Sequence, residues 1–217
     1  MTRALALLLV IAATPQLWGQ TPASSDTNAV APVLPDSDVT TAITLGQSRK
    51  NKRTYGYSGV ADCTKFGAFL ASNSNLRIYG VIGQGPYGRV VDASAQATRK
   101  YLPFGPGDVS AEMRAPTLTV GIQQYMEDMK TTVVPVEHVV IRGVNKEGAV
   151  GAALQPTHVE ELPDYYQNLM GAKIETKGAL ATFDMKSLPE GDLQIVVILS
   201  DGECHATLHA RDRNKIK

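Results

Sequence analysis

The sequence contains few of the residues and motifs that define catalytic or metal-binding classes. It has only two cysteines, Cys63 and Cys204, and they form no C-x-x-C pair, which argues against a thioredoxin-like redox centre and a zinc knuckle. The motifs G-x-S-x-G, S-x-x-K and H-E-x-x-H are absent from the chain, and with them the common nucleophile and zinc-protease arrangements. We therefore expect no catalytic residue, no bound cofactor and no metal site.

An excess of charge of either sign is also lacking. The chain has 21 Lys and Arg residues against 21 Asp and Glu residues, so its formal net charge is zero. No overall field attracts phosphate groups or anionic membranes. The composition predicts a protein that does not bind nucleic acid, and it does not identify a partner.

What is present first is the layout of a secretory signal peptide. Arg3 precedes the uncharged run 4–13, which is too short to cross a bilayer because crossing takes about 20 apolar residues. We expect cleavage after Gly19, or else after Ala23, where a small residue stands at the cut. The predicted product is exported to the periplasm or the medium, has no transmembrane segment and contains roughly 195 residues, enough for one large or two small domains.

The predicted mature chain opens with a leader, residues 20–53. Residues 20–41 are rich in Thr, Ser, Ala, Pro and Asp and have no aromatic residue, so they are expected to be flexible and sensitive to proteases. The leader ends in the basic run from Arg49 to Arg53. We interpret this run as a solvated linker end, with an anionic-surface contact or a dibasic processing site as alternatives.

Residues 54–217 have the pattern of a β-rich globular domain. A helix is predicted over residues 86–102, with Pro86 as its first residue and Pro103 beyond its end. Short apolar or alternating runs predict strands at 76–82, 117–122, 132–142, 149–155, 172–176, 179–185, 193–199 and 204–210. This spacing is typical of a mainly β, antiparallel sandwich with one substantial helix at an edge or end. The alternative is a small α+β piece ending near residue 116, followed by an immunoglobulin-like sandwich.

The strongest local signal is a hairpin at residues 200–203, where Asp201-Gly202 suits a two-residue turn. This turn predicts that Leu199 faces Cys204 and that Ile198 faces His205. One face of the hairpin is then apolar and includes Leu193, Ile195, Val197, Leu199, Cys204, Ala206, Leu208 and Ala210. Cys204 therefore points into the predicted core.

The two cysteines are predicted to form a disulfide, because an exported chain with an even cysteine number favours pairing. The bridge requires the Cα atoms of Cys63 and Cys204 to lie within about 7 Å. Closing so long a loop would stabilise the fold by about 5 kcal/mol on the chain-entropy model. Two separate buried thiols remain the alternative.

The segment 83–88 matches G-x-G-x-x-G between a predicted strand and a predicted helix. A dinucleotide site would need a carboxylate after the next strand, but Gln123 and Gln124 stand there, and no β-α alternation follows. A kinase loop would need H-R-D and D-F-G motifs, which are absent. We therefore interpret the glycines as allowing positive φ in a tight connection.

Histidines and carboxylates form two further candidate groups. His205 and His209 have H-x-x-x-H spacing, but on a strand they lie about 13 Å apart, so a metal site would have to combine His205 with His138 or His158 from a neighbouring strand. The acidic group Glu160, Glu161 and Asp164, beside Tyr165 and Tyr166, has the composition of a glycosidase pair or sugar-binding rim, although a solvated turn before Pro163 also explains it. An activated thiol at Cys63 beside Lys65 is a weaker alternative to the disulfide.

These patterns favour an exported, non-enzymatic binding or structural module of the bacterial cell envelope. The alternative is a secreted hydrolase of envelope polysaccharide or peptide, built on the acidic group and a histidine. Carboxyl groups about 5 to 9.5 Å apart in a cleft would favour the hydrolase, and dispersed exposed acids would favour the binding module.

Overall fold

The computed structural model of the protein describes residues 33–48, 55–63, 78–125, 134–145, 147–169, 172–200 and 202–216. Ala31–Lys217 form one compact unit. The predicted signal peptide 1–19 and the basic run from Arg49 to Arg53 lie outside the described residues.

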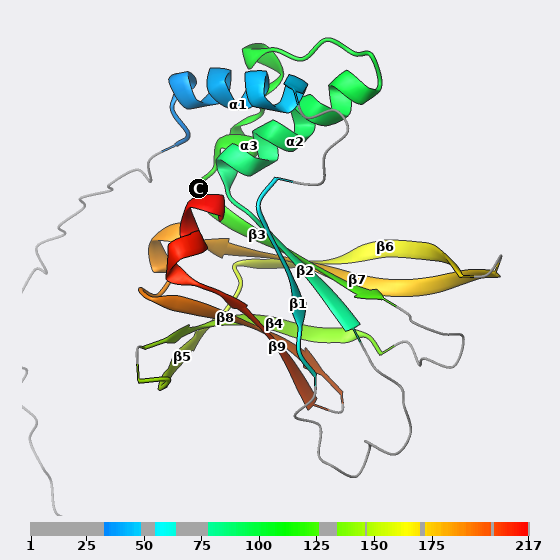
Figure 1. Cartoon of the computed structure of the whole chain (residues 1–217), viewed down its shortest axis with the longest axis vertical. Helices are drawn as coiled ribbons and strands as arrows, with labels where there is room; N and C mark the ends of the chain where they lie inside the picture. Colours follow the sequence, from blue (N-terminus) through cyan, green and yellow to red (C-terminus); the bar gives the residue numbers. More distant parts are fainter. Residues whose placement is uncertain are drawn as a thin grey trace, which may run out of the picture. The chain divides into compact units, whose positions relative to one another are not determined.

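Two antiparallel sheets pack face to face (Figure 1). The first, sheet A, has the order β1-β2-β3-β7-β6, from β1 (Tyr57–Ala61), β2 (Ile78–Gln84), β3 (Thr117–Tyr125), β7 (Ala172–Asp184) and β6 (His158–Leu169). The second, sheet B, has the order β5-β4-β8-β9, from β5 (Val150–Leu154), β4 (Val136–Val144), β8 (Asp192–Leu199) and β9 (Gly202–Leu208). The predicted antiparallel sandwich is confirmed.

The core lies between the sheets and follows the alternation of the strands. Alternate residues of β3 and β7 are buried from one side, and alternate residues of β8 and β9 from the other. The main core residues are Tyr79, Val81, Leu118, Val120, Ile122, Ala181, Phe183, Val139, Ile141, Leu193, Ile195, Val197, Cys204, Ala206 and Leu208. Each strand thus turns one face to the core, because side chains alternate with period two.

The β8–β9 hairpin forms as predicted, but with a different register. Leu199 pairs with Gly202 and Val197 pairs with Cys204, so the predicted pairing of Leu199 with Cys204 is wrong by two residues. A shift of two keeps every side chain on its face, and Cys204 is fully buried as expected. Ala210 is exposed because β9 ends at Leu208 and the 3-10 helix η3 (Ala210–Ile216) follows.

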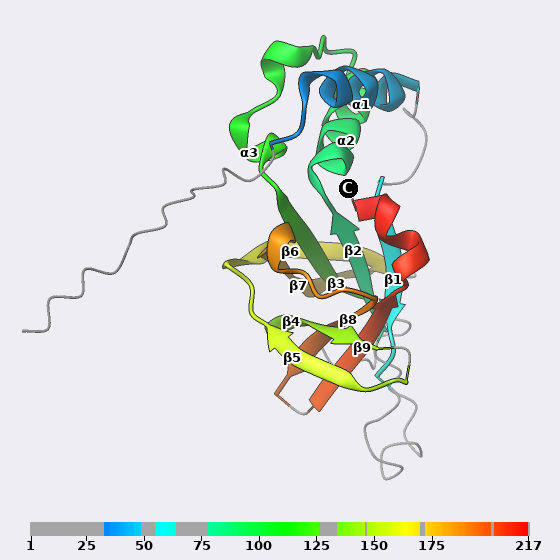
Figure 2. The same cartoon turned by 90° about the vertical axis from the view of Figure 1, so that its left-hand side faces the viewer.

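A layer of helices covers one end of the sandwich (Figure 2). The predicted helix is α2 (Pro86–Arg99), and it packs against α1 (Asp36–Ser48). Val39, Ala42 and Ile43 of α1 are buried in a cluster with Val90 and Val91 of α2. The expectation of a flexible leader is therefore wrong for residues 36–48, since apolar residues spaced three and four apart give this segment a face to bury.

The structure also connects the two sides of residue 116, near which the alternative two-domain division was placed. β2, which precedes it, pairs along its length with β3, which follows it. Arg89 of α2 donates hydrogen bonds to the carbonyl oxygens of Thr117 (2.8 Å) and Ala115 (2.6 Å), and α3 (Ala111–Arg114) ends beside this contact. Strand pairing and the Arg89 hydrogen bonds thus connect the parts of the chain before and after residue 116.

Candidate functional site

One edge of the sandwich is closed where β1 passes from sheet A to sheet B. Beyond its pairing with β2, the chain at Asp62 pairs with His205 of β9. The Asp62 N–H donates to the His205 carbonyl (2.7 Å), and the His205 N–H donates to the Asp62 carbonyl (2.9 Å). We call this β1–β9 junction the closed edge.

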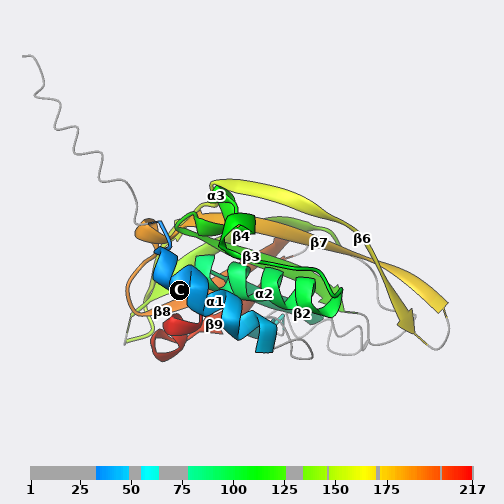
Figure 3. The ribbon, with the colours of Figure 1, turned by 90° about the horizontal axis from the view of Figure 1, so that it is seen from above.

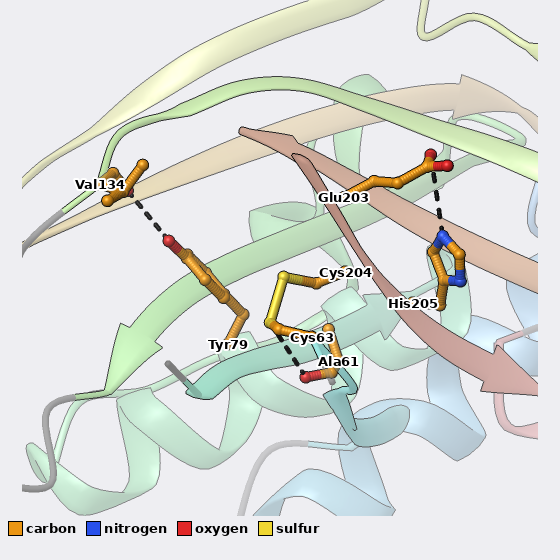
Figure 4. The surroundings of a disulfide bond; sticks show 7 residues. All are labelled: Ala61, Cys63, Tyr79, Val134, Glu203, Cys204 and His205. Atoms are coloured by element: carbon orange, nitrogen blue, oxygen red, sulfur yellow. Dashed lines mark hydrogen bonds and ion pairs between the residues drawn. A yellow bond between two sulfur atoms is a disulfide. The ribbon is translucent and has the colours of Figure 1, made fainter. Parts of the chain in front are cut away.

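The predicted disulfide lies directly at the closed edge (Figure 4). Cys63 and Cys204 are bonded, their Cα atoms are 4.2 Å apart, and 141 positions separate them in sequence. No cysteine is free, so the activated-thiol alternative at Cys63 is wrong. The bridge joins the N-terminal part of the domain to its last hairpin.

A small charged cluster lies beside the bridge on the outer face of sheet B. Glu203 Oε2 lies 3.6 Å from an Arg142 guanidinium nitrogen and 3.7 Å from His205 Nε2. Val140 and Val196 are buried in the adjacent cross-strand row, in which Val196 pairs with both Val140 and His205. Glu203 of β9 thus lies near Arg142 of β4, on the far side of β8, in a polar cluster beside apolar side chains.

The histidines of the H-x-x-x-H pair have different partners. His209 Nδ1 lies 2.9 Å from Asp192 Oδ2, and the Ala210 N–H donates to Asp192 Oδ1 (2.8 Å). The Ala210 hydrogen bond, followed by that of His209, lowers the pKa of Asp192. His138 and His158 are exposed on strands of different sheets. In the described part of the chain, no three His, Cys, Asp or Glu residues converge in a group suited to a metal ion.

The glycine-rich segment between β2 and α2 lies beside a hydrogen-bond network made by side-chain and backbone groups of the protein itself. Gln84 Nε2 donates to the Tyr55 carbonyl (2.9 Å) and to Asp92 Oδ2 (2.6 Å), while the Tyr55 N–H donates to Asp92 Oδ1 (2.8 Å). The interpretation that the glycines adopt positive φ is wrong, because Gly83, Gly85 and Gly88 are not among the positive-φ glycines. Gly88 instead permits close approach, since a β-carbon there would lie 3.1 Å from the Tyr55 carbonyl oxygen.

The acidic group lies on β6, where the sequence had indicated a turn. Glu160 and Glu161 are both exposed, and as neighbours on a strand they point to opposite faces of the sheet. Leu162 pairs with Gly178 and Tyr165 with Thr176, so one extra residue forms a bulge that includes Pro163 and Asp164. The structure therefore does not bring the two glutamates together in one cleft, as the hydrolase alternative requires.

The opposite side of the sandwich is an open edge formed by β5 and β6. In the described sheets each of these strands has a neighbour on one side only. All of β5 is exposed or half-buried, with Val150 51% exposed. A shallow depression of about 280 Å³ lies beside β5, lined by Gly143, Asn145, Ala149, Val150, Gly151 and Glu190.

The largest feature of the open edge is a two-stranded arm, made of residues 163–169 of β6 and 172–177 of β7. The pairing of β7 with β3 ends at Gly178, so the described part of β7 beyond it pairs with β6 alone. Figures 1 and 3 show this ribbon continuing past the other strands of sheet A. Sequence reasoning missed the arm because Pro163 and its acidic neighbours resemble a turn.

Comparison with known proteins does not assign a role to these surfaces. No protein-family model matches the chain, and no characterised protein or solved structure is significantly similar to it. Among the described helices, none is long and apolar enough to cross a membrane.

Proposed function

We propose that this protein is an exported, non-enzymatic binding or structural module of the bacterial cell envelope, and that the arm is its main contact element. The disulfide supports the compartment, because such bonds form and persist in oxidising surroundings outside the cytosol. The apolar run after Arg3 supports the same destination.

The observation that carries the proposed role is the pairing of the arm. Five residue pairs, from Tyr165–Thr176 to Leu169–Ala172, join β6 and β7, and no other described strand lies beside them. A two-stranded ribbon in water is marginally stable at best, and it gains stability when it packs on another surface. An arm of this kind is suited to holding a partner.

The side of β6 that has no neighbour among the described strands offers the partner a row of backbone groups. A strand at a sheet edge leaves N–H and C=O groups available for pairing. Pro163 and the bulge interrupt this row, so a partner strand would pair with residues 165–169 on one side of the bulge or 158–162 on the other.

Site-specific photo-crosslinking in the native host tests the proposal. A crosslinking amino acid at Gln167 in the arm should give discrete adducts with an envelope component. The matched probe at Thr44, exposed on α1, should give none. Removing residues 165–176 should weaken adducts from a probe at Glu160, which lies on the other side of the bulge, and should leave the thermal unfolding of the sandwich cooperative. Equal adduct patterns from Gln167 and Thr44, or no adduct from either, would contradict the assignment.

A further inference from the structure

The C-terminal end of α2 carries a backbone conformation that is unusual for its residue. The Leu102 N–H donates to the Ala97 carbonyl (2.9 Å), and the Tyr101 N–H donates to the Thr98 carbonyl (3.1 Å). These two bonds form a Schellman motif, in which the residue after the C-cap adopts left-handed backbone and is most often glycine. Here that residue is Tyr101, with φ of 57°, the one non-glycine residue with positive φ in the described part of the chain.

The Tyr101 side chain buries almost no surface that could offset the cost of this backbone conformation. Tyr101 is 96% exposed and the following Leu102 is 58% exposed, so neither ring nor isobutyl group is packed away. A strained residue whose side chain is almost entirely exposed in the described part of the chain points to a role outside the fold. We call residues 99–102, Arg-Lys-Tyr-Leu, the α2 tip.

The α2 tip combines apolar and basic groups at a protruding position. Arg99 and Lys100 are exposed beside the two apolar side chains. Figures 1 and 2 show α2 running from the sheets to the far side of the helical layer, so its end is remote from the sandwich. Asp108, the one carboxylate of residues 99–108, accepts a hydrogen bond from the Gly105 N–H (2.8 Å).

We propose that the α2 tip docks this protein on an anionic lipid surface. Tyr prefers the headgroup level of a bilayer, where its ring is half in the apolar region and its hydroxyl is hydrated. Leu102 inserts beside it, and the ammonium and guanidinium groups bind lipid phosphates. The chain as a whole has no net charge, so the attraction is local to the tip and is weakened by salt.

A flat lipid surface fits this tip better than a protein pocket does. An aromatic anchor that enters a protein pocket is surrounded by a ring of contacts that exclude water. Tyr101 is 96% exposed, so the described part of this protein contributes no such ring of contacts around it. Two cations next to two apolar groups match the order of phosphates and acyl chains in a membrane interface.

The test measures vesicle binding by the chain from Gln20 onward, which retains the whole compact unit. The probes are vesicles of equal parts phosphatidylglycerol and phosphatidylcholine, and vesicles of phosphatidylcholine alone. We expect binding to the anionic vesicles, with loss of roughly fivefold in the partition coefficient for each of Arg99→Gln and Lys100→Gln. The control variants Val60→Ser and Arg211→Gln, both at exposed positions distant in sequence, should bind as the parent does.

Tyr101→Gly separates binding from folding. Glycine relieves the left-handed strain, so this variant should raise the unfolding midpoint by roughly 2–4 °C while lowering vesicle binding. Unchanged binding in the tip variants would overturn the proposal, and so would equal losses in the controls. Crosslinks from Tyr101 to a protein, without vesicle binding by the parent chain, would also overturn it and indicate a protein partner. The experiment is independent of the arm, so its failure leaves the proposed function standing.

Discussion

At the closed edge the two sheets are joined by hydrogen bonds and a disulfide, whereas at the open edge β5 and β6 each have one side unpaired among the described strands. The closed edge also has the Tyr57 hydroxyl donating to the Thr207 carbonyl (3.0 Å), a second link from β1 to β9. The sandwich is therefore linked across its sheets at the closed edge, whereas the described strands of the open edge have no such link. Substitutions at the two edges should therefore affect different properties.

Breaking the disulfide should have the largest effect on stability. Cys63→Ser removes the covalent link between β1 and β9, and we expect a loss of about 2–5 kcal/mol in the free energy of unfolding. Urea denaturation of the oxidised proteins measures the change. The reduced parent protein should match the variant, and a variant as stable as the oxidised parent would refute the role given to the bridge.

Removing the Tyr57 hydroxyl should weaken the closed edge less. Tyr57→Phe loses one hydrogen bond to a backbone carbonyl, with an expected cost of about 1 kcal/mol near neutral pH. Desolvation by burial, assisted by Asp212, raises the pKa of Tyr57. The folded state therefore binds the Tyr57 proton more tightly than the unfolded state does. The stability that this contributes is fully present below the unfolded pKa of the tyrosine and is lost as pH rises through its folded pKa.

The parent should therefore lose stability faster than Tyr57→Phe as pH rises above about 10. Thermal midpoints across that range measure the difference between the two proteins. A difference that stays constant with pH would show that ionisation of Tyr57 is not linked to folding.

Acid should selectively release the C-terminal segment that follows the closed edge. The pKa of Asp192 is lowered by the Ala210 N–H and by His209, so its contribution is present above the unfolded pKa and is lost as pH falls through the folded pKa. Asp192→Asn should be less stable than the parent near neutrality, and the difference should shrink below about pH 4. Asp184→Asn is the control, because Asp184 also accepts a hydrogen bond from a backbone N–H of a 3-10 helix, that of Lys186 in η2 (Met185–Ser187).

Substitution at the open edge should have the smallest effect. Val150→Ser on β5 alters a side chain that is 51% exposed, and surface changes of this kind stay within about 0.5 kcal/mol. Chemical denaturation of this variant beside Cys63→Ser gives the comparison directly. A loss as large as that of the disulfide variant would mean that the open edge also holds the sandwich together.

The closed edge was the part of the fold best predicted from the sequence, because the alternating pattern of β9 and the pairing of the two cysteines both indicate it. Cys204 was placed on the core face by the alternating run around it, and the bridge to Cys63 followed from the cysteine number and the expected export. The exact turn was not predictable, because a shift of two residues leaves every side chain on the same face. Alternation therefore determines the faces of a hairpin more firmly than its pairing.

Two elements were missed because local composition opposed the structure they adopt. α1 is rich in threonine, and its burial depends on the facing residues of α2, which are distant in sequence. β6 contains Pro163 and several carboxylates, yet it forms because β7 supplies a long partner and a bulge accommodates the proline. In both cases tertiary pairing overrides local propensity.

The disulfide also limits how far the protein can be extended by a pulling force. Tension applied at the two ends of the compact unit passes from Cys63 to Cys204 through the sulfur atoms, so the segment between them is outside the load path. The 141-position separation corresponds to about 480 Å of chain at ~3.4 Å per residue, and none of that length can be drawn out while the bond is intact. Under load, an oxidised molecule can extend only its two terminal segments, which contain α1, β1 and the end of β9. The strands between the two cysteines, including both strands of the arm, bear none of the tension.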